Sequence, residues 1–491
     1  MVGTEMAPLA RTGGLGDVLE TLPAELAQRG HEVSVILPFY RGIRENKSLK
    51  IKRTGVEMAI QVGPRRIETE ILETSAPNDI QIFLVRRDEY FDRSELYGAD
   101  GRAYEDNAER FIFFSKAAVE LARRVNPTPD IIHAHDWQTA LVPAFVRDYG
   151  LPFRTVLTIH NVAYQGSFWG YDFGLTNLPG HFFGANGVEF YGRLNFLKGG
   201  ILFADAVTTV SEHYARDIQT PEYGAGLDAV LREQSRKIVG ILNGADYTTW
   251  NPATDKLIPK KYSADSLAGK TNCRNALLEK MKLAKNPRGP VFAMVTRLAE
   301  QKGLDILLPL LDRLLADDVR LIILGEGDAS YSRELSIAAK RHAENFAFHR
   351  GLDENLSHLI EAGADITLIP SRFEPCGLSA MYSLKYGTIP IARATGGLHQ
   401  IIQDYDPTSG SGNGFLFYEY HPEALWDAIG RAKKFFADET AWRQLMQLAM
   451  STDFSWSNAA EAYEKIYAQI APVAAASAAE KESAKTAKTE S

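Results

Sequence analysis

The sequence predicts an α/β protein of two doubly wound domains that face each other across a deep cleft. The first observation behind this prediction is that short apolar runs alternate with amphipathic stretches of helical period, which is the pattern of a parallel sheet covered by helices on both faces. The second is that this rhythm stops in a less regular zone and then starts again. The third is that glycine-rich or polar turns follow several apolar runs, and such folds bind ligands at the carboxyl ends of their strands.

The first series of apolar runs predicts buried strands at 33–37, 80–85, 131–134, 155–158 and 206–210. A helix is predicted over 106–124, where the apolar positions Phe111, Phe114, Ala118, Leu121 and Ala122 fall on one stripe. A further helix is predicted to begin in the glycine turn at 12–18 and to end at Gly30. Because strands and helices alternate, the sheet is expected to be parallel.

The second series predicts strands at 291–295, 320–324, 347–349, 366–369 and 389–392. The zone from about 245 to 290 carries turn and linker signals such as Asn251-Pro252 and Asn286-Pro287. We therefore expect domains at 1–245 and 246–455, a helix at 456–473 that crosses back to the first domain, and a disordered tail at 474–491. The tail prediction follows from its composition, which contains no aromatic residue to bury.

The composition excludes several classes of protein. The chain has 491 residues, of which 45% are hydrophobic and 24% are charged, which is typical of globular proteins. Its net charge of −8 argues against a nucleic-acid partner, and the lack of a long apolar run argues against a membrane partner. Only Cys273 and Cys376 are present, so we expect a reducing compartment. With no signal or transit pattern at the N-terminus, the expected location is the cytoplasm of a bacterium.

Two turns could bind phosphate. The backbone N–H groups of the glycine turn at 12–18 could approach an anion at a helix start, but the turn matches no standard phosphate motif, so an ordinary turn is the alternative. Arg297 and Lys302 follow the strand at 291–295 and could reach one cleft, Arg as a fork and Lys as a point charge. Two solvated surface cations are the alternative for this pair.

The segment from Ser371 to Ser379 follows another strand. Pro375 is predicted in the first turn of a helix that runs to Tyr386, which would place Glu374 at the helix entrance, where a carboxylate could hold sugar hydroxyls. The alternative for Glu374 is an acid that only favours the helix dipole. Cys376 could be a nucleophile at a helix start, but no histidine partner is evident, which favours a packing role.

Histidines follow two further strands. His133-Ala134-His135-Asp136 could suggest metal ligation, but no further cluster completes a metal site. Side chains that orient a sugar are the preferred functional interpretation, and buried, hydrogen-bonded histidines are the structural alternative. Polar or glycine turns at His160-Asn161, Asn243 and 395–397 follow other strands, and this convergence is what a cleft enzyme requires.

At this point the residues resemble a known family. From about residue 2 to about residue 470, the chain is similar to bacterial glycogen synthases and plant starch synthases, which form glycosyltransferase family 5 and have the GT-B fold of two Rossmann-like domains. The matching strings are Gly13 to Val18, Tyr90 to Arg93, Asp106 to Phe111, His133 to Pro143, Thr158 to Gly166, Leu197 to Gly200, Thr220 to Gly224, Trp250 to Asp255 and Pro370 to Leu378.

The resemblance implies an enzyme that transfers glucose from ADP-glucose to the non-reducing end of an α-1,4-glucan with retention of configuration. By this resemblance, the catalytic residues are His160, Arg297, Lys302 and Glu374. The donor-binding residues are Arg11, Gly14, Gly16, Asn243, Cys376, Gly377, Leu378, Ser379, Thr395, Gly396 and Gly397. The residues on the acceptor side are Glu5, Asp17, Asp136 and Asn161. No cofactor and no metal are expected.

The chain departs from the family pattern at a few positions. Arg11 stands where the family usually has Lys, only four residues precede Glu5, and His399-Gln400 replaces a segment that commonly contains Asp. Leu352 stands where the family often has an aromatic residue, which could stack on the adenine base. This difference leaves UDP-glucose as an alternative donor. A glucan-binding scaffold without activity is the alternative from another class, but Arg297, Lys302 and Glu374 argue against it.

Overall fold

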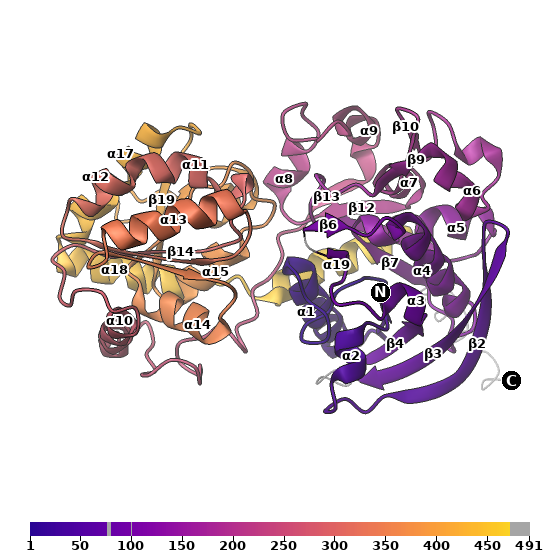
Figure 1. Cartoon of the computed structure of the whole chain (residues 1–491), viewed down its shortest axis with the longest axis horizontal. Helices are drawn as coiled ribbons and strands as arrows, with labels where there is room; N and C mark the ends of the chain where they lie inside the picture. The colour runs from indigo at the N-terminus through magenta and orange to yellow at the C-terminus, as the bar shows by residue number, and fades with distance from the viewer. Residues whose placement is uncertain (76–79, 100, 472–491) are drawn as a thin grey trace, which may run out of the picture. The chain divides into compact units, whose positions relative to one another are not determined.

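The computed structural model describes residues 1–75, 80–99 and 101–471 (Figure 1). The chain divides into two compact units: the first comprises residues up to Val210, Ala215–Ile241 and the chain from Trp456, and the second comprises Ser211–Tyr214 and Leu242–Ser455. This division falls slightly before the expected domain boundary at 245. The predicted tail at 474–491 lies outside the described residues.

The strands of both series are confirmed, with ends that differ from the predicted ones by a residue or so. In the first unit they are β1 (Ser34–Pro38), β4 (Gln81–Arg86), β7 (Ile131–His135), β8 (Arg154–Ile159) and β12 (Ala206–Thr209). In the second unit they are β14 (Val291–Val295), β15 (Arg320–Gly325), β16 (Phe346–Arg350), β17 (Ile366–Ile369) and β18 (Ile389–Arg393). Such runs are legible in a sequence because strands buried on both faces are apolar throughout.

The N-terminal residues join two halves of the first sheet. The halves have the strand orders β2-β3-β4-β1 and β7-β8-β12-β13, where β13 is Ile238–Gly240. Val2 forms parallel bridges to both Ile36 of β1 and Ala134 of β7. Its N–H donates to the His133 carbonyl at 2.8 Å, and its own carbonyl accepts from the N–H of His135 at 3.1 Å. Residues 1–4 therefore supply the link between β1 and β7, and Glu5 comes directly after it.

The expectation of a wholly parallel sheet is wrong in the first unit. Strands β2 (Lys52–Val62) and β3 (Arg65–Ser75) form a long antiparallel hairpin, and β3 is also antiparallel to β4. Polar, exposed residues alternate with buried ones along both strands, as they do in a sheet with one wet face. The turn residue Gly63 has φ +56°, a conformation that favours glycine.

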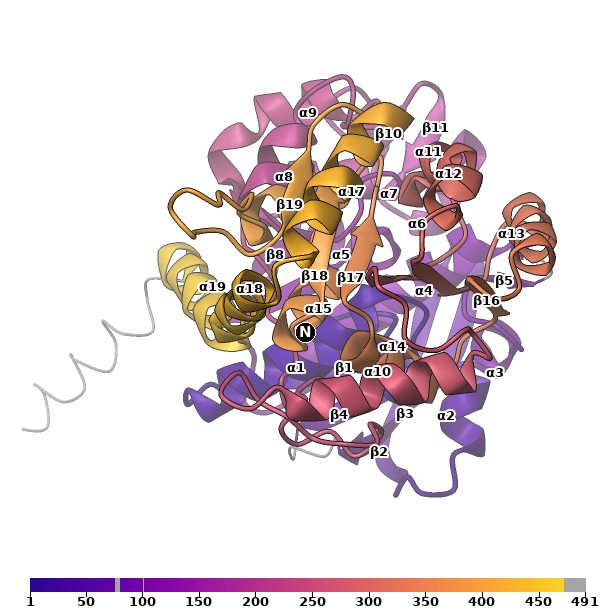
Figure 2. The same cartoon turned by 90° about the vertical axis from the view of Figure 1, so that its left-hand side faces the viewer.

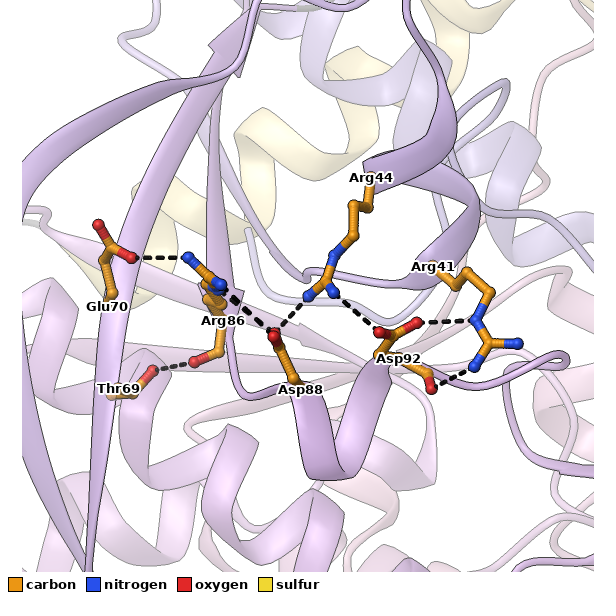
Figure 3. A network of polar contacts seen from close by, with 7 residues as sticks. All are labelled: Arg41, Arg44, Thr69, Glu70, Arg86, Asp88 and Asp92. Carbon is orange, nitrogen blue, oxygen red and sulfur yellow. Dashed lines mark hydrogen bonds and ion pairs between the residues drawn. The ribbon is translucent and has the colours of Figure 1, made fainter.

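A series of alternating charges fastens two short helices, α2 (Arg41–Glu45) and α3 (Asp88–Phe91), to the first sheet (Figure 3). In order along the series, the side chains are Glu70, Arg86, Asp88, Arg44, Asp92 and Arg41. Arg44 bridges two carboxylates, contacting Asp88 and lying 2.8 Å from Asp92. Because these groups are partly exposed, each pair contributes only about 0–1 kcal/mol, and the series mainly fixes geometry.

The helices of the first unit include α1 (Gly14–Gln28), α4 (Asn107–Ala122), α5 (Val142–Asp148), α7 (Phe196–Phe203) and α19 (Trp456–Ile470). The predicted helices at 12–30 and 106–124 correspond to α1 and α4. Trp456, Tyr463 and Ile466 of α19 belong to one buried cluster with Leu22 and Leu26 of α1. The last helix of the chain is thus part of the first unit's core.

The second unit is a six-stranded parallel sheet of order β16-β15-β14-β17-β18-β19, where β19 is Phe415–Phe417 (Figure 2). Helices cover both faces of this sheet (Figure 1). They include α10 (Ala268–Lys280), α13 (Ala329–Arg341), α14 (Glu354–Gly363), α15 (Leu378–Lys385), α17 (Pro422–Phe436) and α18 (Glu439–Ser451). Helix α10 lies inside the zone that the sequence marked only as irregular, and its Cys273, Leu277 and Leu278 are fully buried.

Helix α15 corrects one prediction. It begins at Leu378, so Pro375 does not lie in its first turn. The residue before the helix, Gly377, has φ +91°, a left-handed conformation that a right-handed helix cannot continue through. The helix therefore starts after this glycine.

The string from Trp250 to Asp255 is anchored within the second unit. One carboxylate oxygen of Asp255 accepts hydrogen bonds from the Tyr386 hydroxyl at 2.6 Å and from His358 Nδ1 at 2.8 Å. The Trp250 ring stacks on His358 with 3.9 Å between centroids. Both partners belong to the second unit, His358 on α14 and Tyr386 directly after α15, so this motif holds an otherwise irregular segment in place. Across the part of the chain that the structure describes, no helix is long and apolar enough to cross a membrane.

Candidate active site

Four predicted residues of the first unit follow neighbouring parallel segments of its sheet. Glu5 comes after the N-terminal segment, Asp136 after β7, and His160 with Asn161 after β8. Because the carboxyl ends of parallel strands meet at one edge of a sheet, these residues gather at one edge of the first unit.

Glu5 is almost fully buried, and its carboxylate holds the glycine turn. One oxygen accepts from the backbone N–H groups of Thr12 at 2.6 Å and Gly13 at 3.0 Å. The other accepts from the Thr12 hydroxyl at 2.7 Å and the Tyr97 hydroxyl at 2.8 Å. These contacts make Glu5 a positioning residue for the turn, and its contact with an acceptor sugar stays a prediction. The sequence carried no signal for Tyr97, which is distant along the chain.

The glycine turn leads directly into α1. Gly13 precedes the helix and has no side chain with which to cap its first N–H groups. A Cβ on Gly16 would lie 3.0 Å from Cγ of Arg11, so the turn is tight at this point. Arg11 is half exposed and pairs with Asp17 at 3.0 Å. The start of a long helix beside an arginine has the features of an anion-binding site.

Asp136 fixes the turn that carries His160. It has φ +60°, an unusual value for a residue other than glycine. Its carboxylate accepts from the backbone N–H of His160 at 2.9 Å and also from that of Asn161. Loss of contact with water raises the pKa of Asp136 to about 7. Asp136 therefore orients the two residues expected at the sugar.

His160 is neutral. Burial lowers its pKa to about 3, so its imidazole stays uncharged through the physiological range. Its Nε2 lies 3.1 Å from Nδ1 of His135, whose pKa burial also holds well below the usual value. Because both rings are neutral, one of the two facing nitrogens carries a proton and donates it in a hydrogen bond to the other. His160 is therefore suited to hydrogen bonding, and not to acting as an acid in the form of an imidazolium.

His133 is a buried histidine with its hydrogen bonds made inside the protein. Its Nδ1 lies 2.8 Å from the hydroxyl of Tyr467 on α19, and its Nε2 lies 2.6 Å from Oγ1 of Thr158. This is the structural alternative that the sequence left open for this residue. Among the described residues, no group of three or more His, Cys, Asp or Glu side chains is arranged to hold a metal ion.

The predicted residues of the second unit follow three adjacent strands as well, β14, β17 and β18. Nζ of Lys302 lies 2.6 Å from Oε2 of Glu374, and the Ser371 hydroxyl donates to the same oxygen at 3.1 Å. The side chains of Lys302 and Glu374 are only 18% and 12% exposed. A short, mostly buried contact of this kind fixes both side chains in position.

Glycines allow these loops to touch through their backbones. A Cβ on Gly303, which has φ +75°, would lie 1.9 Å from the Pro370 carbonyl oxygen. A Cβ on Gly396 would lie 2.1 Å from the Glu374 carbonyl oxygen, and the N–H of Gly397 donates to that oxygen at 3.0 Å. The glycine turn at 395–397 is therefore needed for close packing against the Glu374 loop.

The other donor-side residues lie around this contact. Arg297 is exposed, and its guanidinium donates to Oε1 of Gln301 at 3.3 Å. Gly377, Leu378 and Ser379 form the start of α15, and Thr395 is buried. The structure thus gathers Arg297, Lys302 and Glu374 on neighbouring loops of one sheet, which supports a joint role over two independent surface cations.

Cys376 is poorly suited to act as a nucleophile. Burial raises the pKa of its thiol to about 12, and the nearby Glu374 charge acts in the same direction. The thiol also hydrogen-bonds Asn243, which is itself buried. This agrees with the packing role that the sequence favoured.

The raised pKa of Asp136 predicts a pH effect on stability. Since the folded-state pKa, about 7, lies above the ordinary value of 3.8, ionising this group disfavours the folded state, and its favourable contribution is lost as the pH rises toward and through about 7. Asp136→Asn keeps an oxygen that can accept from the His160 N–H. We expect the unfolding free energy of the wild type, minus that of Asp136→Asn, to fall between about pH 4 and about pH 7 and to level off above that.

Urea unfolding of both proteins at several pH values measures this difference. The buried histidines titrate equally in both proteins, so their effect cancels. A difference that stays constant with pH would show that Asp136 titrates at its ordinary value.

Comparison with known proteins identifies the chain. Residues 1–233 match the family model of the starch synthase catalytic domain, and residues 277–439 match that of glycosyl transferases group 1. Relatives named glycogen synthase include one from Opitutus terrae, 44% identical over 95% of this chain and 98% of the relative, and one from an Anaeromyxobacter species, 45% identical over 96% and 98%.

Solved structures agree with these matches. The catalytic domain of starch synthase IV from Arabidopsis thaliana, bound to ADP and acarbose, superposes with a TM-score of 0.89 at 34% identity, covering 96% of this chain and 98% of that one. Sucrose-phosphate synthase from Thermosynechococcus elongatus, at 19% identity and a TM-score of 0.58, shares the fold alone. The expected family and fold class are therefore confirmed: the chain belongs to the starch synthase and glycogen synthase family, glycosyltransferase family 5, and is a glycosyltransferase of the GT-B fold.

Proposed function

We propose that the protein elongates an α-1,4-glucan by transferring glucose from ADP-glucose to the non-reducing end, with retention of configuration. The observation that carries the proposal is the pairing of Lys302 with Glu374 beside the glycine turn at 395–397. The names of the relatives and the ADP and acarbose in the starch synthase IV structure support a nucleotide-sugar donor and a glucan acceptor.

The chemistry of the second unit suits a leaving diphosphate. Separation of a sugar cation from a nucleotide anion develops negative charge on the leaving group. Arg297 and Lys302 would stabilise that charge, and Glu374 would hold donor-sugar hydroxyls while keeping Lys302 in place. The same two cations allow the reaction to proceed without a metal or another cofactor.

The acceptor side would be served by the first unit. Asp136 orients His160 and Asn161, and a neutral His160 can hydrogen-bond a sugar without adding positive charge near the reacting carbon. Glu5, Asp136 and Glu374 all accept hydrogen bonds within the chain, so none of these three carboxylates is an obvious nucleophile. We therefore favour attack by the acceptor on the face that the diphosphate leaves.

The decisive experiment measures transfer of labelled glucose onto glycogen, with ADP-glucose or UDP-glucose as donor, in the presence of EDTA. Turnover with ADP-glucose supports the proposal in full. Turnover only with UDP-glucose would reassign the donor. Leu352→Tyr would then test the base contact, since Leu352 is 89% exposed. No turnover by a folded protein that binds glycogen would favour the scaffold alternative.

The location also remains a proposal. We place the enzyme in the bacterial cytoplasm. The two glycogen synthases named above come from bacteria, and both cysteines are buried and unpaired, which suits a reducing compartment.

A further inference from the structure

A small antiparallel sheet in the first unit presents aromatic side chains to solvent. Its strands are β9 (Ser167–Trp169), β11 (Arg193–Asn195) and β10 (Glu189–Phe190), in the order β10-β11-β9. Phe168 and Leu194 are cross-strand partners on the inner face, where the Phe168 ring packs on Phe196 at 4.9 Å. Trp169 and Phe190 both pair with Arg193, so these three residues share the outer face.

The exposure of these aromatic rings is high. Trp169, Tyr171 and Tyr191 are 64%, 77% and 86% exposed. The rings of Trp169 and Tyr171 lie 4.5 Å apart, and Tyr191 lies 4.6 Å from Phe190. We call Trp169, Tyr171, Phe190 and Tyr191 the aromatic platform. Exposed apolar groups gathered in this way are typical of binding surfaces.

The platform is held rigid by its backbone. Tyr191 and Gly192 have φ +49° and +75°, the conformation of a tight two-residue hairpin turn. The N–H of Gly192 also donates to Oε1 of Glu189 at 2.7 Å. A Cβ on Gly170 would lie 2.4 Å from the Gly192 carbonyl oxygen, so the turn packs directly on the end of β9. Because the backbone that carries the rings is fixed in advance, binding a ligand orders only the side chains.

The platform is continuous with the acceptor-side residues of the same unit. Trp137 directly follows Asp136, and its ring lies 5.7 Å from that of Phe168 on the inner face of the small sheet. A Cβ on Gly166, just before β9, would lie 2.4 Å from the Trp137 ring. The segment that carries the platform also begins shortly after Asn161. The platform and the acceptor-side turn therefore rest on the same tryptophan.

We propose that the aromatic platform binds an α-1,4-glucan chain and so holds the body of the acceptor polymer beside the reacting end. This inference rests on the proposed glucan acceptor. Pyranose rings offer apolar C–H faces that stack on aromatic rings, and hydroxyl rims that hydrogen-bond flanking polar groups. The platform supplies the aromatic rings, and its two tyrosine hydroxyls and the adjacent Arg193 supply the polar groups.

The charges around the platform fit an uncharged polymer. Arg193 binds Ser167 through its Nε at 2.8 Å and also attracts the carboxylate of Asp172, while Glu189 is bonded to the hairpin turn. Nζ of Lys198 lies 5.8 Å from the centre of the Phe190 ring and donates to the Glu189 carbonyl. Two cations and two anions that already contact their neighbours leave no strong field of either sign. A polysaccharide is therefore favoured over a nucleic acid or an acidic peptide.

The test is electrophoresis of the native protein through gels that contain glycogen, without any donor. Trp169→Ala combined with Tyr191→Ala is expected to raise the dissociation constant for glycogen about tenfold, because two stacking contacts are lost. The KM for glycogen should rise by a similar factor, with kcat and the turnover of maltotriose unchanged. Tyr149→Ala removes an exposed tyrosine outside the platform and should behave like the wild type.

Unchanged retardation of the double variant by glycogen would overturn the proposal. A change from dimer to monomer in sedimentation, with glycogen binding intact, would also overturn it and assign the platform to contact between copies of the chain. Trp169→Phe keeps a ring and should retain binding if Trp169→Ala fails to fold. Because the gels need no catalysis, glycogen binding by the platform in an inactive protein would contradict the proposed transfer alone.

Discussion

Lys302→Ala is expected to lower kcat by about 10²–10³-fold, the usual cost of removing one group that stabilises developing negative charge. Lys302 is the mostly buried partner of Glu374, so its loss removes a cation proposed at the diphosphate and leaves a carboxylate without its charge partner. Both effects raise the barrier to separation of the sugar from the nucleotide. Steady-state transfer of labelled glucose at saturating donor measures the change.

The controls for this prediction are the same substitution at another lysine and a substitution that keeps the charge at position 302. Lys340→Ala removes an exposed lysine on α13 and should leave kcat unchanged. Lys302→Arg keeps the charge with a different geometry, so its kcat should lie between that of Lys302→Ala and that of the wild type. Glycogen binding should survive in all three variants. A Lys302→Ala enzyme with the kcat of the wild type would remove Lys302 from the proposed mechanism.

Glu5→Ala is expected to destabilise the first unit by about 3 kcal/mol and to abolish most turnover. The carboxylate accepts four hydrogen bonds in a buried site, and its removal leaves the N–H groups of Thr12 and Gly13 without their acceptor. The glycine turn before α1 would then lose its shape. Urea unfolding, followed by a probe of the first unit, measures the change in free energy.

Glu5→Gln separates charge from hydrogen bonding. Its amide oxygen can still accept from Thr12 and Gly13, while its NH₂ group can donate to the hydroxyls of Thr12 and Tyr97, which are able to accept. We expect this variant to retain most of its stability and activity. Equal damage from Gln and Ala would show that the negative charge itself is required, as a direct contact with substrate would demand.

The sequence indicated which loops carry the candidate residues of the second unit, but not the contacts around those residues. Arg297, Lys302 and Glu374 were found from their positions after apolar runs, because the carboxyl ends of parallel strands are a local feature of the chain. The inferred geometry around Glu374 was less accurate, since Gly377 delays the start of α15. The pattern of apolar residues does not show that Gly377 adopts a left-handed conformation.

Contacts between distant residues were not predictable. Tyr97 binds Glu5, and Tyr467 of the last helix binds His133 in the middle of the sheet. Neither tyrosine stands in a motif, and only packing of the folded chain brings them to their partners. The neutral state of His160 also depends on burial, which a single sequence does not reveal.

The sequence alone therefore determined the α/β class, the two series of strands, the family resemblance and the loops that carry the site. These features are predictable because buried strands and glycine turns produce patterns among residues that are neighbours in the sequence. The tertiary structure decided the antiparallel hairpin of β2 and β3, the role of Glu5 as the anchor of the glycine turn and the charge states of Asp136 and His160. These depend on which distant groups exclude water from a side chain, and that is settled only when the chain has packed.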